Sequence, residues 1–302
     1  MGQTDAFSDF DALLAGQLLT DPWEHAVGET PRYTPDYRLL GELLSIPIAS
    51  AQVSESGRFA KAIDAWAAHE LRRAGFGSDE VWPRATRPRV LSRDIAVLLD
   101  KPPGRLATEV GARLENMPAV GPVDARILGR AYEKQVDVCI ARWDRGPELL
   151  ISTKAQVSSF GKNLPNRFEE AYGDAGNLRG RYPLGAIGFL FVQRATVLEQ
   201  EPEAFERTID MMRKLRDVGD GNGYTATALV LAEWDSPPGS RTGVAIREHE
   251  VPDDVAAPQF FTALVQQVLA VAPVVHHVDV RSQIERRHIP VVEADATDAA
   301  PG

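Results

Sequence analysis

Residues 136–170 read VDVCIARWDRGPELLISTKAQVSSFGKNLPNRFEE, and this stretch decides which fold we expect. Val136, Val138 and Ile140 alternate with less apolar residues, a period of two that is typical of a β-strand with one buried face. A turn at 144–147 contains Gly146 and Pro147, and the run ELLISTK at 148–154 predicts a second strand. The sequence therefore predicts a β-hairpin at the centre of the chain.

The expected register of this hairpin brings charged side chains together. A turn centred between residues 145 and 146 would place Asp137 opposite Lys154 and Cys139 opposite Ser152, with Cβ atoms roughly 4.5–5.5 Å apart. The helix predicted from 163 would carry Arg167 and Glu170 on one face, because they are three residues apart. Two carboxylates and an amine could thus converge at one end of the hairpin.

Such a convergence suits the hydrolysis of a phosphodiester. Mg²⁺ is typically held by one or two carboxylates with waters and substrate oxygens, and it lowers the pKa of the attacking water. A lysine beside the metal can orient that water or stabilise the charged transition state. The alternative interpretation is an ordinary cross-strand ion pair on a solvent-facing hairpin, which would contribute about 0.2–1 kcal/mol.

These residues resemble the PD-(D/E)xK nuclease superfamily, which places an Asp on one strand and an (Asp/Glu)-x-Lys on the next. Here the second motif reads Ser152-Thr153-Lys154, so a serine replaces the usual acid. One branch, the restriction enzymes that cut sites with a central CCGG, has Ser-x-Lys followed by Arg-x-x-Glu and takes the acid from the next helix. This chain has twelve residues after Lys154 and then Arg167-Phe168-Glu169-Glu170.

The resemblance implies a set of site residues. Asp137 and Glu170 would bind Mg²⁺, with the carbonyl of Thr153 as a further ligand and Glu169 as the rival of Glu170. Lys154 would position the water, Ser152 would stand in the place of the acid, and Arg167 would orient Glu170 or touch a phosphate. The polar flank of the motif supplies the expected DNA contacts, which are Gln156, Lys162, Asn163, Arg179 and Arg181.

We expect an α/β fold, a mixed sheet flanked by helices with the αβββαβ core of restriction endonucleases. The expected divisions are a helical N-terminal extension at 1–54, a core domain at 55–275 with a helical insertion at 91–131, and a tail at 276–302 that is disordered at its end. Helices are predicted at 7–19, 37–44, 55–74, 123–132, 203–218 and 258–271, and strands at 81–84, 186–193, 226–234 and 244–251. A glycine-rich loop is predicted at 171–183.

Isolated residues in this pattern have simpler interpretations. Cys139 is expected to be a buried core residue. Glu70 or Glu55 could supply a further acid from the helix at 55–74, although a surface charge is the favoured interpretation. Trp23 looks exposed in its loop, and His276-His277 is expected to be a surface pair.

Composition excludes several classes of protein. The net charge is −10, but the charges are distributed unevenly along the chain. Between Lys154 and Arg181 there are five basic and three acidic residues, whereas from Glu199 onward there are 18 acidic and 9 basic residues. A single cysteine fits a reducing cytoplasm, and no HExxH motif is present. The start lacks the pattern of a signal peptide, and no run approaches 18 uncharged apolar residues, so we expect no membrane anchor.

We therefore predict a Mg²⁺-dependent DNA endonuclease of the restriction type that acts as a homodimer, with a cognate methyltransferase as a candidate partner in function. Three alternatives stay open: a structure-selective repair nuclease on the same core, a small-molecule phosphoesterase, and a catalytically silent nuclease fold that binds DNA or assembles with other proteins. The missing acid at Ser152 favours the last of these.

Overall fold

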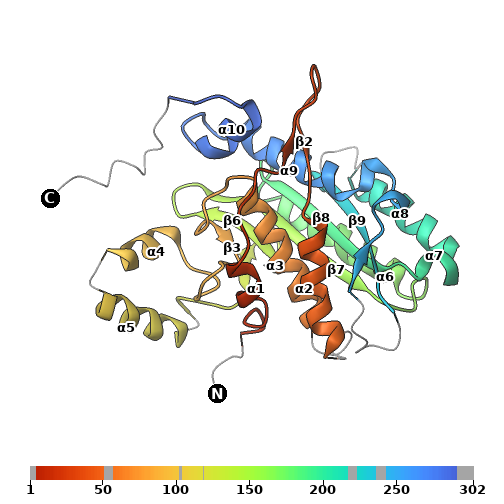
Figure 1. The fold of residues 1–302 in the computed structure, drawn as a ribbon, viewed down its shortest axis with the longest axis horizontal. Helices are drawn as coiled ribbons and strands as arrows, with labels where there is room; N and C mark the ends of the chain where they lie inside the picture. Colours follow the sequence, from red (N-terminus) through yellow and green to blue (C-terminus); the bar gives the residue numbers. More distant parts are fainter. Residues whose placement is uncertain are drawn as a thin grey trace.

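A six-stranded sheet forms the centre of the molecule in the computed structural model (Figure 1), which describes residues 5–50, 57–101, 104–117, 119–216, 223–235 and 243–290. The strand order is β10-β9-β8-β7-β6-β3. Strands β7, β8 and β9 are parallel, whereas β3, β6 and β10 are antiparallel to their neighbours. The strands are β3 (Val81–Trp82), β6 (Val138–Arg142), β7 (Gly146–Gln156), β8 (Ala186–Arg194), β9 (Ala226–Glu233) and β10 (Ala245–Ile246).

Helices cover both faces of this curled mixed sheet, so the expected α/β class is confirmed. One face packs against α2 (Tyr37–Ala49), α3 (Arg58–Arg73) and α9 (Ala257–Val271), and the other packs against α6 (Leu164–Arg179) and α8 (Pro202–Arg216). Because both faces are covered, every residue of β6 is buried, not only the alternate ones that we expected. The predicted burial of Cys139 is confirmed.

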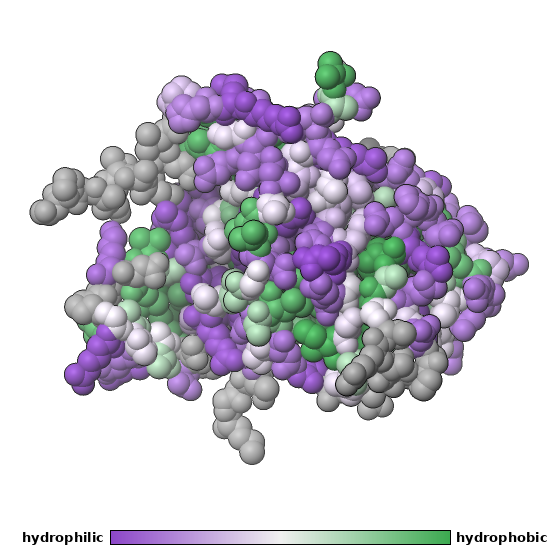
Figure 2. All heavy atoms as spheres, in the orientation of Figure 1, coloured by the Kyte–Doolittle hydropathy of each residue, from purple (hydrophilic) through white to green (hydrophobic). Residues whose placement is uncertain are grey.

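Smaller elements surround this core. A ribbon of β1 (Trp23–Glu24) and β2 (Arg32–Tyr33) packs by β2 against α9, and β4 (Ala125–Leu128) pairs with β5 (Glu133–Val136). Helices α4 (Arg93–Asp100) and α5 (Gly104–Glu115) stand beside the sheet as a pair (Figure 1), and Figure 2 shows apolar side chains at the surface over them, where Leu98 and Leu106 are at least half exposed. The remaining elements are α1 (Asp11–Ala15), α7 (Val197–Gln200), α10 (Val278–Glu285) and the 3₁₀ turns Glu248–Glu250 and Asp253–Val255.

The register of the central hairpin differs from our expectation by two residues. Cys139 pairs with Leu150 rather than Ser152, and Val138 pairs with Ile151. The turn occupies residues 143–145 instead of 144–147, which shifts the pairing by three residues, and an irregularity between Ile140 and Ala141 reduces that shift to two. A shift of two keeps Cys139 on the face expected from the period of two, but Val136 belongs to strand β5 and to the buried cluster on the opposite face from Val138.

Two predicted segments were wrong. Residues 125–128 form strand β4 instead of part of a helix, and residues 171–179 continue helix α6 instead of forming a loop. The buried Asn177 explains both, since its side-chain oxygen accepts hydrogen bonds from the backbone N–H groups of Ala131 and Tyr132. This polar contact connects the β4–β5 ribbon to α6. It involves Asn177, a residue type that is common in loops and that favoured the prediction of a loop here.

Three surface predictions were also wrong. Trp23 is buried, and Glu70 is fully buried beside Arg73 and the hydroxyl of Tyr33. His277 is buried as well, with its Nε2 3.1 Å from a carboxylate oxygen of Glu148, and it leads into α10 within the expected tail. Glu55 and the end of the tail at 291–302 lie outside the described residues.

The N-terminal residues share the main core. Phe10, Tyr33 and Leu39 belong to the same buried cluster as α3 and α9, so a boundary at residue 54 separates no independent core. Helix α1 covers only 11–15 of the helix predicted at 7–19. Among the helices of the described ranges, none has the length and apolar character needed to cross a bilayer.

Candidate functional site

A cleft of about 580 Å³ lies along the C-terminal half of β7. Strand β6 begins opposite Ile151, and β7 continues to Gln156 beside β8. Successive residues of a strand face opposite sides, so Thr153 points toward α3 while Lys154 points toward α6. The cleft therefore receives side chains from both faces of the sheet.

Two aspartates in this cleft accept hydrogen bonds from the same residue, Thr153. A carboxylate oxygen of Asp137 accepts the backbone N–H of Thr153 at 2.8 Å, and Asp64 of α3 accepts the hydroxyl of the same residue at 2.6 Å. Asp137 was predicted as a site residue, whereas Asp64 was missed. Its signal is an acid inside the apolar run AIDAWAA of a helix that is buried on nearly all sides.

Burial makes both carboxylates costly as anions. Burial raises the pKa of Asp64, and the nearby charge of Asp137 raises it further, while Lys61 and the Thr153 hydroxyl act in the opposite direction. Burial likewise raises the pKa of Asp137 despite its bond to the Thr153 N–H and the positive charge of Lys61. Two buried acids, one of which raises the proton affinity of the other, are a favourable place for a cation.

Lys61 supplies a positive charge beside these acids. Its ammonium lies 3.3 Å from Asp64 and 3.0 Å from Asp124. Burial alone would lower the pKa of Lys61, but Asp64 and Asp124 outweigh burial and hold it above its ordinary value. Lys61 also lies 5.0 Å from the centre of the Phe7 ring, so the N-terminal segment contacts a residue that lines the cleft.

Lys154 pairs with Glu170 rather than with Asp137. The two charged groups are 2.8 Å apart, and Lys134 lies 3.5 Å from the same Glu170 oxygen. The hydrogen bond from Lys154 holds the pKa of Glu170 below its ordinary value. Glu170 is half exposed and does not line the cleft, while its rival Glu169 faces a separate apolar pocket beside Met211 and Lys214.

The other predicted residues divide between the cleft and the scaffold. Arg167, Asn163 and Gln156 line the cleft, but the Gln156 amide is occupied by the carbonyl groups of Ser159 and Phe160. Ser152 is buried, and its hydroxyl makes no hydrogen bond within the described part of the chain.

The remaining predicted DNA contacts lie away from the cleft lining. Arg179 donates hydrogen bonds to Pro183, Gly185, Gly223 and Thr225, and therefore fastens the end of α6 to the sheet. Arg181 is exposed just beyond that end of α6, and Lys162 is exposed before its start.

The donor set fits a hard divalent cation. Asp64 and Asp137 offer only oxygen ligands, as Mg²⁺ prefers, and two carboxylates with waters are a usual complement for this ion. No group of three or more His, Cys, Asp or Glu side chains suited to a metal occurs in the described ranges.

No protein-family model matches this chain, and the searches of curated proteins and of solved structures also gave no match. The function must therefore be inferred from the residues of the cleft.

Proposed function

We propose that this protein is a metal-dependent DNA endonuclease of the restriction type, built on a restriction-endonuclease-like αβββαβ core. One observation carries the proposal: two carboxylates from distant parts of the chain, Asp64 and Asp137, bind the same residue, and that residue immediately precedes Lys154. Acidic residues next to a lysine near the end of a strand are groups that can carry out phosphodiester hydrolysis with a bound metal.

Each residue has a distinct role in this proposal. Asp64 and Asp137 would hold Mg²⁺, and Thr153 keeps both carboxylates in place through its hydroxyl and its N–H. When bound, the ion supplies charge neutralisation at the phosphate and a lower pKa for a bound water. Lys154 would donate a hydrogen bond to the attacking water or to a phosphate oxygen. The oxygen of that water then bonds to phosphorus while a bridging P–O bond breaks.

Our proposal differs from the sequence prediction at Glu170. Its carboxylate is engaged by Lys154 and Lys134, so we assign it to positioning Lys154 and assign the second metal-binding acid to Asp64. The hydroxyl and N–H of Thr153, instead of its carbonyl, then connect the two acids.

The decisive experiment is cleavage of methyl-free phage DNA by the purified protein in Mg²⁺, followed by sequencing of the ends. We expect cleavage by the wild type and a loss of at least about a hundredfold in Asp64→Asn, Asp137→Asn and Lys154→Ala, given the usual worth of such groups. Glu169→Gln is the matched control, because Glu169 faces away from the cleft. Full activity in all three site variants would end this assignment.

One observation favours a second candidate, a silent nuclease fold that binds DNA: Ser152 replaces the usual acid, and its buried hydroxyl has no described partner. That candidate predicts no cleavage of any DNA by the wild type in Mg²⁺ or Mn²⁺ while binding persists. Cleavage that disappears in Lys154→Ala without loss of DNA binding would reject it.

The restriction type itself makes a testable prediction about assembly. Recognition sites of this type are usually two-fold symmetric, which matches a homodimer, so we expect a solution mass of twice the 33.0 kDa chain. A monomer that cuts branched DNA in preference to linear DNA would instead indicate a structure-selective repair nuclease.

A further inference from the structure

Arg167 differs from the other cations of the cleft. Lys61 pairs with Asp64 and Asp124, and Lys154 pairs with Glu170. The side chain of Arg167 has no hydrogen bond or ion pair to any residue in the described ranges, although its Nε is buried. Buried donors almost always have partners, so a guanidinium left open beside a cleft indicates that its partner comes with the ligand.

The position of Arg167 is fixed by its surroundings. It lies between Leu164 and Phe168, both buried, and Phe168 packs against Phe189 and Phe191 of β8. The loop before α6 is also held, because the carboxylate of Glu201 accepts the N–H groups of Phe160 and Gly161. Because this element is rigid, binding of a ligand needs to order only the side chain of Arg167 and not its backbone.

Asn163 adds a second donor at the same end of the cleft. It precedes α6 and lines the cleft, and its side chain makes no capping hydrogen bond to that helix. A guanidinium fork with a neighbouring amide suits a phosphate, whose oxygens accept several hydrogen bonds at once.

We propose that Arg167, with Asn163, binds a backbone phosphate that neighbours the one cut and thereby sets how the DNA strand lies in the cleft. This inference rests on the proposed function, because Lys154, Asp64 and Asp137 are assigned to the scissile phosphate. Arg167 is then a binding residue for the nontransferred part of the substrate, and it does not orient Glu170.

The test is binding of a fluorescein-labelled random-sequence duplex in Ca²⁺, measured by anisotropy at several salt concentrations. We expect Arg167→Gln to raise Kd about tenfold or more and to reduce the slope of log K against log salt by about 1, as loss of one phosphate contact does. Arg181→Gln is the matched control, since it removes the same charge about 20 Å away at the other end of α6. Its Kd should not change.

Two further variants keep the test decisive. Arg167→Lys should recover part of the affinity, and Asn163→Ala should weaken binding about threefold or more, because it removes one hydrogen bond to the phosphate. These variants would carry the test if Arg167→Gln failed to fold, which thermal melting would reveal. At saturating DNA, the single-turnover cleavage rate of Arg167→Gln should stay within about threefold of wild type, because uniform binding affects affinity rather than the chemical step.

Three results would overturn the inference: unchanged binding in Arg167→Gln, equal weakening in Arg181→Gln, or a large fall in cleavage rate with unchanged Kd. Failure of the nuclease proposal looks different. If the wild type cuts no DNA but Arg167→Gln alone loses affinity and salt dependence, the phosphate site stands without the nuclease. If the wild type cuts and Arg167→Gln binds normally, the nuclease stands without the phosphate site.

Discussion

Thr153 holds the two acids of the cleft together, one through its side chain and one through its backbone. Replacing its hydroxyl with a methyl group in Thr153→Val leaves the bond from its N–H to Asp137 in place. We expect a loss of about 1 kcal/mol in the free energy of unfolding and a several-fold higher Mg²⁺ midpoint for cleavage. Thr153→Ser keeps the hydroxyl and should retain the wild-type Mg²⁺ midpoint; an equal shift in both variants would contradict this role.

His69 is a buried histidine whose titration should appear in the stability of the protein. Burial and the positive charges of Arg72 and Arg73 lower its pKa to about 4, against the opposing charge of Asp36. Between that value and the ordinary value of 6.5, the unfolded chain binds the proton and the folded chain does not, so stability rises with pH. The stabilisation is complete above pH 6.5 and is lost as the pH falls through 4.

Urea unfolding of His69→Gln at several pH values measures this effect. The wild type should lose roughly 2 to 3 kcal/mol more than the variant between about pH 7 and about pH 4.5, because only the wild type carries this titrating group. Acidic side chains titrate in both proteins and cancel in the comparison. Parallel stability curves for the two proteins would show that His69 protonates freely in the folded state.

Two adjacent acids of helix α6, Glu169 and Glu170, lie in different surroundings. Replacing each by Gln therefore gives a matched pair of variants. Glu170→Gln removes the charged partner of Lys154, whereas Glu169→Gln changes a residue that faces α8. A partly exposed ion pair contributes about 0.2–1 kcal/mol, so we expect Glu170→Gln to slow single-turnover cleavage roughly two- to fivefold. Its Mg²⁺ midpoint and all properties of Glu169→Gln should match the wild type. A shift of about tenfold or more in that midpoint for Glu170→Gln would instead make Glu170 a metal ligand.

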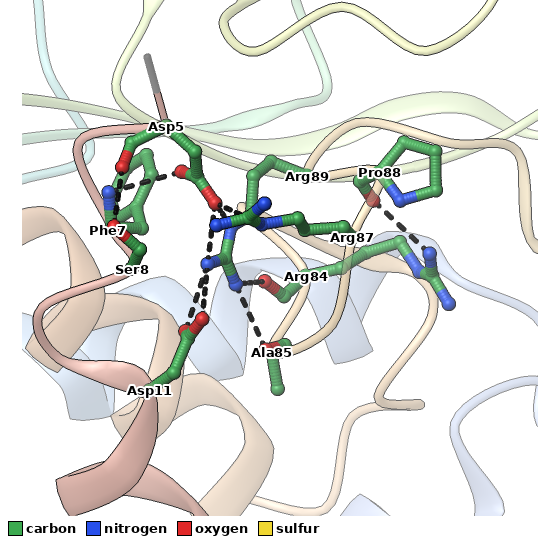
Figure 3. A network of polar contacts seen from close by, with 9 residues as sticks. All are labelled: Asp5, Phe7, Ser8, Asp11, Arg84, Ala85, Arg87, Pro88 and Arg89. Atoms are coloured by element: carbon green, nitrogen blue, oxygen red, sulfur yellow. Dashed lines mark hydrogen bonds and ion pairs between the residues drawn. The ribbon is translucent and has the colours of Figure 1, made fainter. Parts of the chain in front are cut away.

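A network of hydrogen bonds and ion pairs connects the first described residues of the chain to the loop after β3 (Figure 3). Asp5 accepts hydrogen bonds from Arg87 and Arg89, and Asp11 accepts two more from Arg89. Arg89 is only 3% exposed, so its charge depends on these acids for compensation. Phe7 packs between this network and Lys61 of the cleft, which links the N-terminal segment to the site.

Removing one acid from this network should be costly. We expect Asp5→Ala to lower the free energy of unfolding by about 2–4 kcal/mol, because it leaves a buried guanidinium undercompensated. Asp253→Ala is the control, since its pair with Arg32 is 92% exposed on the acid side and should contribute almost nothing. Chemical denaturation of the two variants compares them, and equal losses would show that burial does not govern these pairs.

Local patterns were sufficient for much of the fold. The apolar runs of β8 and β9 predicted these two strands, because burial of both sheet faces imposes nearly continuous hydrophobicity. The apolar stripe of α3 predicted that helix in the same way. Asp137 and Lys154 were found for a related reason, since they lie on adjoining strands of one hairpin. The actual register differs from the expected one by two residues, and Lys154 pairs with Glu170 instead of Asp137.

The sequence by itself determined the strand-rich centre and half of the candidate site, because period-two alternation and hairpin spacing act between near neighbours. Only the tertiary structure decided that Asp64 joins the site, since its bond to Thr153 spans 89 residues and depends on how α3 packs on the sheet. The same packing turned Glu170 toward Lys154, and it placed Asn177 in a buried contact that no local polarity pattern reveals.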